Sequence, residues 1–318
     1  MIPDTLSRVL KEVHLSGGMF VQARFSVPFA VTATDAPTML NMFAPGADHI
    51  LPFHLVTAGK LSVAVAGCDN EQLTEGDIIV LPHGAQHTLQ DQPREESVHA
   101  ADLQISGSPP SLVHGGGGDE ARVLCGFFHC RGRLYNPLLD ALPERIVIRH
   151  DPDRSPWLTA TLQRTFHETV SARPGSAALV ERMTELLFLE VVQRYLADQQ
   201  PSGWLRGLSD EVVGTALSEI HERPAHDWTV EELARRASVS RSVFAERFSE
   251  LVGMSPIRYL ASWRMELAAQ RLLRSSDGIA QIAADVGYES EASFNRAFKK
   301  HVGDPPAAWR RNHTASAS

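Results

Sequence analysis

The sequence has few cysteines and no long apolar run. Its 318 residues include 3 cysteines, an odd number that does not suggest the disulfide framework of a secreted domain. No stretch approaches the ~20 apolar residues that a membrane-spanning helix requires. The start of the chain, Met1–Arg8, lacks the basic stretch and apolar core of a signal peptide. We therefore expect a cytoplasmic protein with no membrane partner.

Basic residues are also scarce, which at first argues against a nucleic-acid partner. The chain has 30 Lys and Arg against 38 Asp and Glu, a net charge of −8. The deficit is uneven: residues 1–224 carry 17 basic and 27 acidic side chains, whereas residues 225–318 carry 13 and 11. An acidic body with a mildly basic end fits DNA contact through that end alone. Ordinary variation between two domains, which this length favours, would give the same pattern.

The C-terminal hundred residues contain an internal repeat. Four residues recur 50 positions later, Phe248, Gly253, Pro256 and Tyr259 as Phe298, Gly303, Pro306 and Trp309. Upstream, Leu233-Ala234 recurs as Ile282-Ala283 at an offset of 49, so the one-residue difference falls between these landmarks, at the turn of each copy. Two copies of one supersecondary unit are therefore present.

The first copy, at about 229–252, has the pattern of helix, turn, helix. Thr229 followed by Glu232 is the signature of a capping box at a helix start. The second helix of this copy begins near Ser240, and its apolar spacing assigns Val243, Phe244 and Phe248 to the buried face.

The second copy, at about 279–302, is joined to the first by one long predicted helix. Gly287 stands in its turn, where a positive φ suits glycine. Ser255 and Pro256 favour a helix start. A helix over 256–274 would be roughly 28 Å long, close to the ~34 Å of one DNA turn. Two helix-turn-helix units on such a connector predict a DNA-binding domain, and a plain helical bundle is the alternative.

Residues 213–312 resemble the DNA-binding domain of the AraC/XylS family. The resemblance rests on three motifs, Ile282–Ser290, Phe294–Lys300 and Gly303–Pro306. It implies a transcription regulator that binds double-stranded promoter DNA, acts with RNA polymerase and forms homodimers. It further implies that the base-reading positions fall on Ser242, Ala245 and Glu246, and on Glu291, Ala292 and Arg296.

The outward residues of the two recognition helices are the candidate DNA contacts. They are Arg241, Ser242, Ala245, Glu246, Ser249, Glu291, Ala292, Asn295, Arg296, Lys299 and Lys300. Arg296 suits bidentate pairing with guanine, and Asn295 suits adenine. Arg241 and the two lysines suit phosphates, which hold register without reading sequence. Glu246 stays open between a cytosine contact and a solvated or intramolecular charge.

Residues 1–150 alternate short β-prone runs with turn residues, which predicts an all-β domain. The segment Gly76–His87 resembles the second cupin motif. In the first motif Pro52 and His54 occupy the two histidine positions, and Ala58-Gly59 stand where a glutamate is expected. The resemblance implies a cupin-like barrel with an incomplete metal site, like the sensor half of many AraC-family proteins. We expect no enzyme activity. The alternative is a metal-dependent cupin enzyme fused to a DNA-binding domain.

Histidine and cysteine side chains in the barrel allow two further hypotheses. His54, His87 and Cys125 are candidate zinc ligands, although packed remnants of a degenerate site would show the same residues. Cys68, Cys125 and Cys130 are candidate redox sensors, whereas buried cysteines are usually inert. No cofactor is required, and zinc is the candidate if one binds. A small-molecule effector is the expected signal, with a redox switch as the alternative.

Residues 151–198 read as helices whose wide apolar stripe suits either a core contact or a dimer seam. The stretch Gln199–Gly203 is polar and turn-rich, so we place a linker at 199–212. The predicted fold class is α+β multidomain, with an N-terminal cupin-like β-barrel over 1–150 followed by helices, and a C-terminal all-α domain over 213–312.

Overall fold

The computed structural model describes residues 5–12, 15–94, 96–107, 110–130, 134–151, 156–169, 171, 173–198 and 201–314. The chain divides into two compact units. The barrel unit comprises Leu15–Cys130 and Leu142–Asp198, and the helical unit comprises Met1–His14, Arg131–Ala141 and Gln199–Ser318. Two segments inside the predicted range 1–150 thus belong to the helical unit, which corrects the expected boundary.

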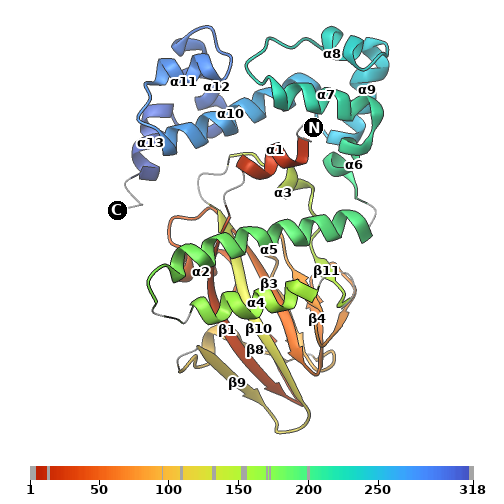
Figure 1. The fold of residues 1–318 in the computed structure, drawn as a ribbon, viewed down its shortest axis with the longest axis vertical. Helices are drawn as coiled ribbons and strands as arrows, with labels where there is room; N and C mark the ends of the chain where they lie inside the picture. Colours follow the sequence, from red (N-terminus) through yellow and green to blue (C-terminus); the bar gives the residue numbers. More distant parts are fainter. Residues whose placement is uncertain are drawn as a thin grey trace. The chain divides into compact units, whose positions relative to one another are not determined.

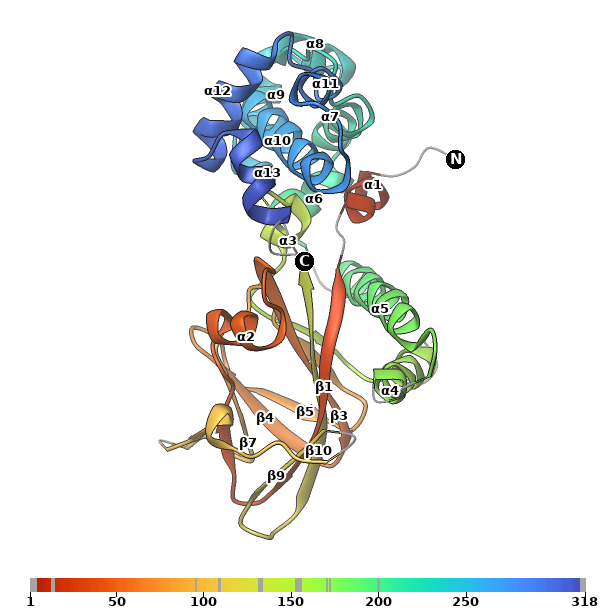
Figure 2. The same cartoon turned by 90° about the vertical axis from the view of Figure 1, so that its left-hand side faces the viewer.

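The barrel unit consists of two facing sheets (Figure 2). The six-stranded sheet has the order β11-β6-β3-β10-β1-β9, with β1 Ser16–Ser26, β3 His49–Ala58, β6 Ile78–Val80, β9 Ser111–Gly115, β10 Glu120–Cys130 and β11 Ile146–Ile148. The five-stranded sheet has the order β5-β4-β7-β2-β8, with β2 Ala30–Thr32, β4 Lys60–Val65, β5 Glu71–Thr74, β7 His87–Gln90 and β8 Val98–His99. Helix α2 (Ala36–Phe43) and the short helix η1 (Ala100–Asp102) lie between strands.

Alternate residues of the facing strands fill the space between the sheets, as the period of two requires. The core combines Phe25 of β1, Val56 of β3, Val63 of β4 and Leu89 of β7, all buried. Cross-strand register then fixes which side chains meet. His54 on β3 pairs directly with Cys125 on β10, so these two side chains leave the sheet on the same face.

The predicted helices after the barrel are present as α4 (Pro156–Thr169) and α5 (Ser176–Asp198). They lie against the outer face of the six-stranded sheet (Figure 1). Phe188 of α5 meets Phe128 of β10 with ring centroids 5.7 Å apart. Leu187 and Val192 are also buried, so one side of α5 is a core contact.

The helical unit consists of helices only within the described residues (Figure 1). They are α1 Thr5–Glu12, α3 Pro137–Ala141, α6 Gly203–Ser209, α7 Glu211–Glu222, α8 Val230–Arg236, α9 Arg241–Val252, α10 Pro256–Arg274, α11 Ile279–Asp285, α12 Glu291–Val302 and α13 Pro306–Thr314. Helix α10 has the predicted bounds, and the pairs α8–α9 and α11–α12 lie at the predicted positions. None of the chain's described helices is long and apolar enough to cross a membrane.

The predicted linker at 199–212 is wrong over most of its length. Residues 203–209 form α6, and α7 begins at Glu211. Trp204 and Leu205 of α6 are buried, and the Trp204 indole donates a 2.8 Å hydrogen bond to the Tyr259 hydroxyl on α10. These buried side chains anchor α6 in the core. The prediction of a linker rested on the polar residues that precede them.

Candidate nucleic-acid interface and barrel cavity

Both helix-turn-helix units begin and turn in the way that their sequences predict. The Thr229 hydroxyl accepts from the Glu232 backbone N–H at 3.1 Å, which caps α8. The returning half of the capping box is not made by Glu232, whose carboxylate contacts His226 Nε2 at 3.1 Å. Ser240 caps α9 and Ser290 caps α12 through the same kind of bond. Each recognition helix therefore starts at a fixed residue.

The turns of the two units have the same backbone geometry at an offset of 49. Ser238 has φ 58 and Gly287 has φ 85. The N–H after each one, of Val239 and Tyr288, donates to the carbonyl of Ala234 and Ala283. This left-handed position costs little only for glycine. The expectation for Gly287 is therefore confirmed, and the duplication holds at the level of hydrogen bonds.

The recognition helices α9 and α12 anchor their inner faces with aromatic pairs. Phe244 and Phe248 are fully buried in α9, as are Phe294 and Phe298 in α12. The predicted contacts lie on the remaining faces: exposed are Arg241, Ser242, Glu246, Glu291, Ala292, Arg296, Lys299 and Lys300, and half-buried are Ala245, Ser249 and Asn295. Their contact with DNA itself stays a prediction.

Val243 corrects the sequence assignment, because its side chain is 48% exposed. Neighbouring helix positions differ by ~100°, and Phe244 faces the core, so Val243 cannot face it fully as well. An exposed valine on a recognition helix suits the methyl group of thymine. The exposure of Val243 was missed because an apolar residue next to a phenylalanine is usually assigned to the buried face.

Arg241 forms an ion pair with Glu231 of α8, with Nε to Oε1 at 2.7 Å. Both side chains are more than half exposed. An exposed pair of this kind contributes between about 0 and 1 kcal/mol, so the guanidinium can exchange its partner for a DNA phosphate at little cost. The pair is compatible with the predicted role of Arg241.

Arg264 of α10 connects the segment before the first helix-turn-helix unit with the turn of the second, and it was not singled out from the sequence. Its Nε donates to the Pro224 carbonyl at 2.7 Å, and one terminal nitrogen donates to the His226 carbonyl at 2.8 Å. The other donates to the Gly287 carbonyl at 3.2 Å, in the turn of the second unit. Arg264 is 9% exposed. Its three bonds therefore fix the segment before the first unit against the second.

Glu266, two residues further along α10, holds a segment that the sequence assigned to the sensor half. Its carboxylate accepts from the backbone N–H groups of Leu134 and Tyr135, both at 2.8 Å, and from Gln270 at 2.9 Å. Glu266 is 2% exposed. The chain that follows β10 is thus fixed to α10, which also carries Arg264.

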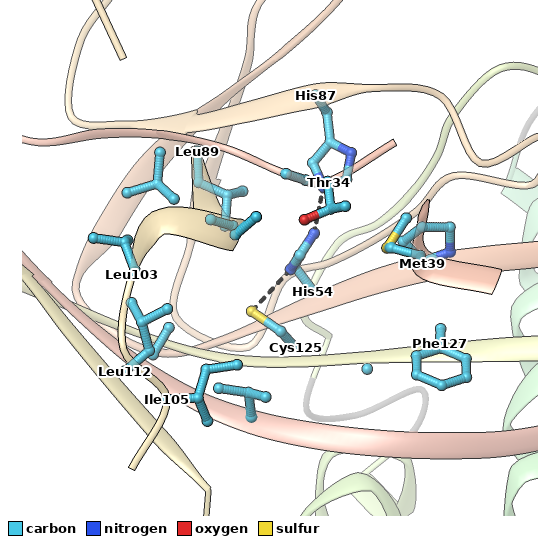
Figure 3. A pocket seen from close by; sticks show the side chains of 18 of the residues that line it. Thr34, Met39, His54, His87, Leu89, Leu103, Ile105, Leu112, Cys125 and Phe127 are labelled. Atoms are coloured by element: carbon cyan, nitrogen blue, oxygen red, sulfur yellow. Dashed lines mark hydrogen bonds between the residues drawn. The ribbon is translucent and has the colours of Figure 1, made fainter. Parts of the chain in front are cut away.

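The barrel unit contains a cavity of about 280 Å³ between its two sheets (Figure 3). Strands of both sheets line it, for example β1 with Phe25, β7 with Leu89 and β10 with Phe127. Met42, Ala101 and Ile105 line it and are also exposed, so they mark its mouth. Most of the lining is aliphatic or aromatic, and the polar side chains within it are few.

His54, His87 and Cys125 meet in this cavity as a chain of hydrogen bonds (Figure 3). His54 Nδ1 lies 3.1 Å from Cys125 Sγ, and His54 Nε2 lies 2.6 Å from His87 Nε2. His87 Nδ1 lies 2.8 Å from the Ala85 carbonyl oxygen. Burial lowers the pKa of His87 to about 4 and, with the neighbouring His87, lowers that of His54 well below its usual value. Both rings are therefore neutral at pH 7.

Proton positions follow from these contacts. A carbonyl oxygen only accepts, so His87 Nδ1 carries a proton and, in the neutral ring, His87 Nε2 accepts. His54 Nε2–H then donates to it, which leaves His54 Nδ1 to accept from the Cys125 thiol. The chain runs in one direction from Cys125 to Ala85, and every ring nitrogen is used.

The three side chains as placed here do not form a zinc site. The two nitrogens of His54 point to opposite neighbours, so no point lies within ligand distance of all three groups. Within the described ranges, no group of three His, Cys, Asp or Glu residues is arranged to hold a metal ion. Zinc binding by these residues stays a prediction that requires the His54 ring to turn.

The burial of the Cys125 thiol does not favour its role as a redox sensor. Burial raises the pKa of the Cys125 thiol to about 12, and the thiolate is the reactive form. Cys130 is buried and Cys68 is half-buried. Oxidation of Cys68, Cys125 or Cys130 stays a prediction.

Comparison with known proteins supports both predicted domains, the cupin-like barrel and the helix-turn-helix domain. A cupin family model matches residues 4–197, and a helix-turn-helix domain model matches residues 233–312. A protein of Streptomyces lividans described as an AraC-like transcription regulator is 32% identical over 98% of each chain. The transcriptional regulator AlkR of Acinetobacter baylyi is 29% identical over 97% of this chain and 99% of its own.

Among solved structures, the DNA-binding domain of AdpA in complex with a target DNA is similar to part of this chain. It is 29% identical, with a TM-score of 0.32, and the match covers 33% of this chain and 95% of that one. The relatives that match almost end to end carry the assignment. The chain belongs to the AraC-like transcription regulators and combines an N-terminal cupin barrel with a C-terminal helix-turn-helix domain.

Proposed function

We propose that this regulator binds a small-molecule effector in the barrel cavity and that the bound effector controls its action at promoter DNA. The cavity is the observation that carries the proposal. It opens to solvent at Met42 and Ile105, and it extends between the two sheets to the buried His54 and His87. An apolar cavity with a few convergent polar groups is the usual form of a ligand site.

A route for the signal starts on β10. Cys125 and Phe127 of this strand line the cavity, and the residues shortly after the strand include Leu134 and Tyr135, which Glu266 holds on α10. A ligand that shifts β10 would pull on this attachment. Because α10 carries both helix-turn-helix units, a change there would alter how the two recognition helices are held.

A homodimer is the form in which we propose that the regulator acts, and α5 offers a surface for it. One side of α5 packs on the sheet, whereas Leu179 and Leu186 on another side are 40% and 53% exposed. These residues are seven apart, two helical turns on one face. Charged neighbours such as Glu181 and Arg182 flank them. A second copy of α5 would bury this stripe.

We further propose RNA polymerase as a partner, because it is the enzyme that a regulator bound at a promoter controls. We propose no catalysis in the barrel. Pro52 stands where one metal ligand is expected, and Ala58-Gly59 stand where a glutamate ligand is expected.

The experiment that tests this proposal fills the cavity with a larger side chain. Leu103 lines it and is half-buried, so Leu103→Trp occupies the space with little strain in the sheets. Val113→Trp is the matched control, since Val113 is 62% exposed and lies outside the cavity. We expect both variants to bind the same genomic fragments in the cell. Transcription at those sites should lose its response to growth conditions only in Leu103→Trp. An unchanged response in that variant would contradict the proposal.

A further inference from the structure

The charge of the cavity wall restricts what the cavity can hold. Among the described side chains that line it, none is Asp, Glu, Lys or Arg. Thr34 supplies the one hydroxyl group of that lining, and the other polar side chains are His54, His87 and Cys125. A charged ligand buried here would lose its hydration without gaining an opposite charge.

The hydrogen-bond chain cannot supply that charge. Each ring nitrogen of His54 and His87 already donates or accepts, and the Cys125 proton is used as well. A ligand carboxylate could accept a hydrogen bond from His54 only if the 2.6 Å bond between His54 and His87 were broken. What remains is the Cys125 sulfur, a weak acceptor, and the Thr34 hydroxyl. Among the described side chains, the cavity therefore offers a hydrocarbon surface with one ordinary hydrogen-bonding group.

The size of the cavity and the side chains at its mouth further restrict which ligands it can hold. An apolar cavity of about 150 Å³ holds benzene, and this one, at about 280 Å³, is nearly twice as large. Met39, Met42 and Phe43 of α2 form one side. Methionine side chains adapt to ligands of different shapes, so the wall suits alkyl chains as well as rings.

We infer that the effector is an uncharged, mostly hydrocarbon molecule larger than benzene, such as a medium-chain alcohol or an alkyl-substituted aromatic, and that the site rejects anions of the same skeleton. The inference rests on the proposed function, since it names the chemistry of the ligand in the same cavity.

A matched pair of probes tests this with the full-length protein. 1-Octanol and octanoate share one chain and differ in charge. In calorimetric titrations at pH 7.5 we expect 1-octanol to bind more tightly than octanoate by more than about a hundredfold, because burying an unpaired charge is costly. Leu103→Trp should lose 1-octanol binding, which shows that the probe occupies the cavity.

A gain of binding provides the second arm. Met42 is 58% exposed at the mouth, so Met42→Lys places a cation there without burying it. This variant should bind octanoate at least tenfold more tightly than wild type does, whereas Met42→Gln should not.

Equal affinity of wild type for octanoate and 1-octanol would overturn the inference and leave an effector cavity standing. Failure of both probes to bind would also overturn it. The transcription response of Leu103→Trp then decides the proposed function on its own.

Discussion

The guanidinium of Arg264, in the middle of α10, donates a 3.2 Å hydrogen bond to the carbonyl oxygen of Gly287 in the turn of the second helix-turn-helix unit. Its other bonds, to Pro224 and His226, reach the segment before the first unit. Arginine presents these donors in one rigid plane. The relative position of the two recognition helices therefore depends on one buried side chain as well as on the length of α10.

The turn glycine should be far less tolerant than its counterpart in the first unit. A Cβ on Gly287 would lie 2.5 Å from the Ala225 carbonyl oxygen at a φ of 85. We expect Gly287→Ala to lower the free energy of unfolding of the helical unit by about 1–3 kcal/mol. Ser238→Gly, at the equivalent position, should change it by less than about 1 kcal/mol. Urea unfolding measures both, and equal losses in the two variants would contradict the special constraint on Gly287.

Arg296 and Lys300 should affect DNA binding in different ways. Both are exposed on α12, but only arginine suits a bidentate contact with guanine. Arg296→Ala should cost about 1–3 kcal/mol and relax the preference at one base position, whereas Lys300→Ala should weaken binding of all sequences alike. Selection from a randomised operator library measures both. Unaltered base preference in Arg296→Ala would remove Arg296 from the base-reading set.

Glu266→Ala should release the segment after β10. The substitution leaves the part-buried N–H groups of Leu134 and Tyr135 without their acceptor, at a cost of up to about 1–3 kcal/mol for each group. Hydrogen exchange of residues 134–141 should become faster, and Glu266→Gln, which keeps one acceptor oxygen, should have a smaller effect. Unchanged exchange in Glu266→Ala would mean that other contacts hold the segment.

His221 should make the helical unit sensitive to acid. Burial, followed by the nearby charge of Arg8, lowers the pKa of His221 to about 3, below its usual ~6.5. Above pH 6.5 the ring is neutral in both states and stability is complete. Between pH 6.5 and 3 only the unfolded chain takes up the proton, so the free energy of unfolding falls by up to ~1.4 kcal/mol per pH unit.

The check compares wild type with His221→Phe, which cannot titrate, by denaturant unfolding between pH 7 and 4.5. Tryptophan fluorescence reports on the right unit, because 4 of the 5 tryptophans lie in it. The stability of the variant should fall less steeply with acidity. Parallel curves for the two proteins would contradict the assigned pKa.

Local patterns in the sequence predicted the parts of this fold that depend on local structure. The bounds of α10 and the turn at Gly287 follow from helix start signals, apolar periodicity and glycine. The pairing of His54 with His87 follows from the cupin-like spacing. Cys125 joins them because the register of β10 against β3 places it opposite His54, which the sequence allowed but did not require.

The parts that escaped prediction depend on distant partners. Arg264 contacts carbonyls of residues 23 to 40 positions away, and Glu266 binds N–H groups more than 130 positions away. Both are charged residues, and charged residues usually face solvent. Helix α6 was missed because its buried Trp204 and Leu205 follow a polar, turn-rich stretch.

The spacing between the two recognition helices is the most direct test of the account. Once an operator is found by sequencing bound fragments, 5 base pairs are inserted between its two boxes, which turns one box to the opposite DNA face. We expect the affinity of the full-length protein to fall by more than about tenfold, and Arg264→Met to bind the unaltered operator more weakly with a smaller loss on insertion. Equal affinity of wild type for both operators would contradict a rigid connector that holds two recognition helices one DNA turn apart.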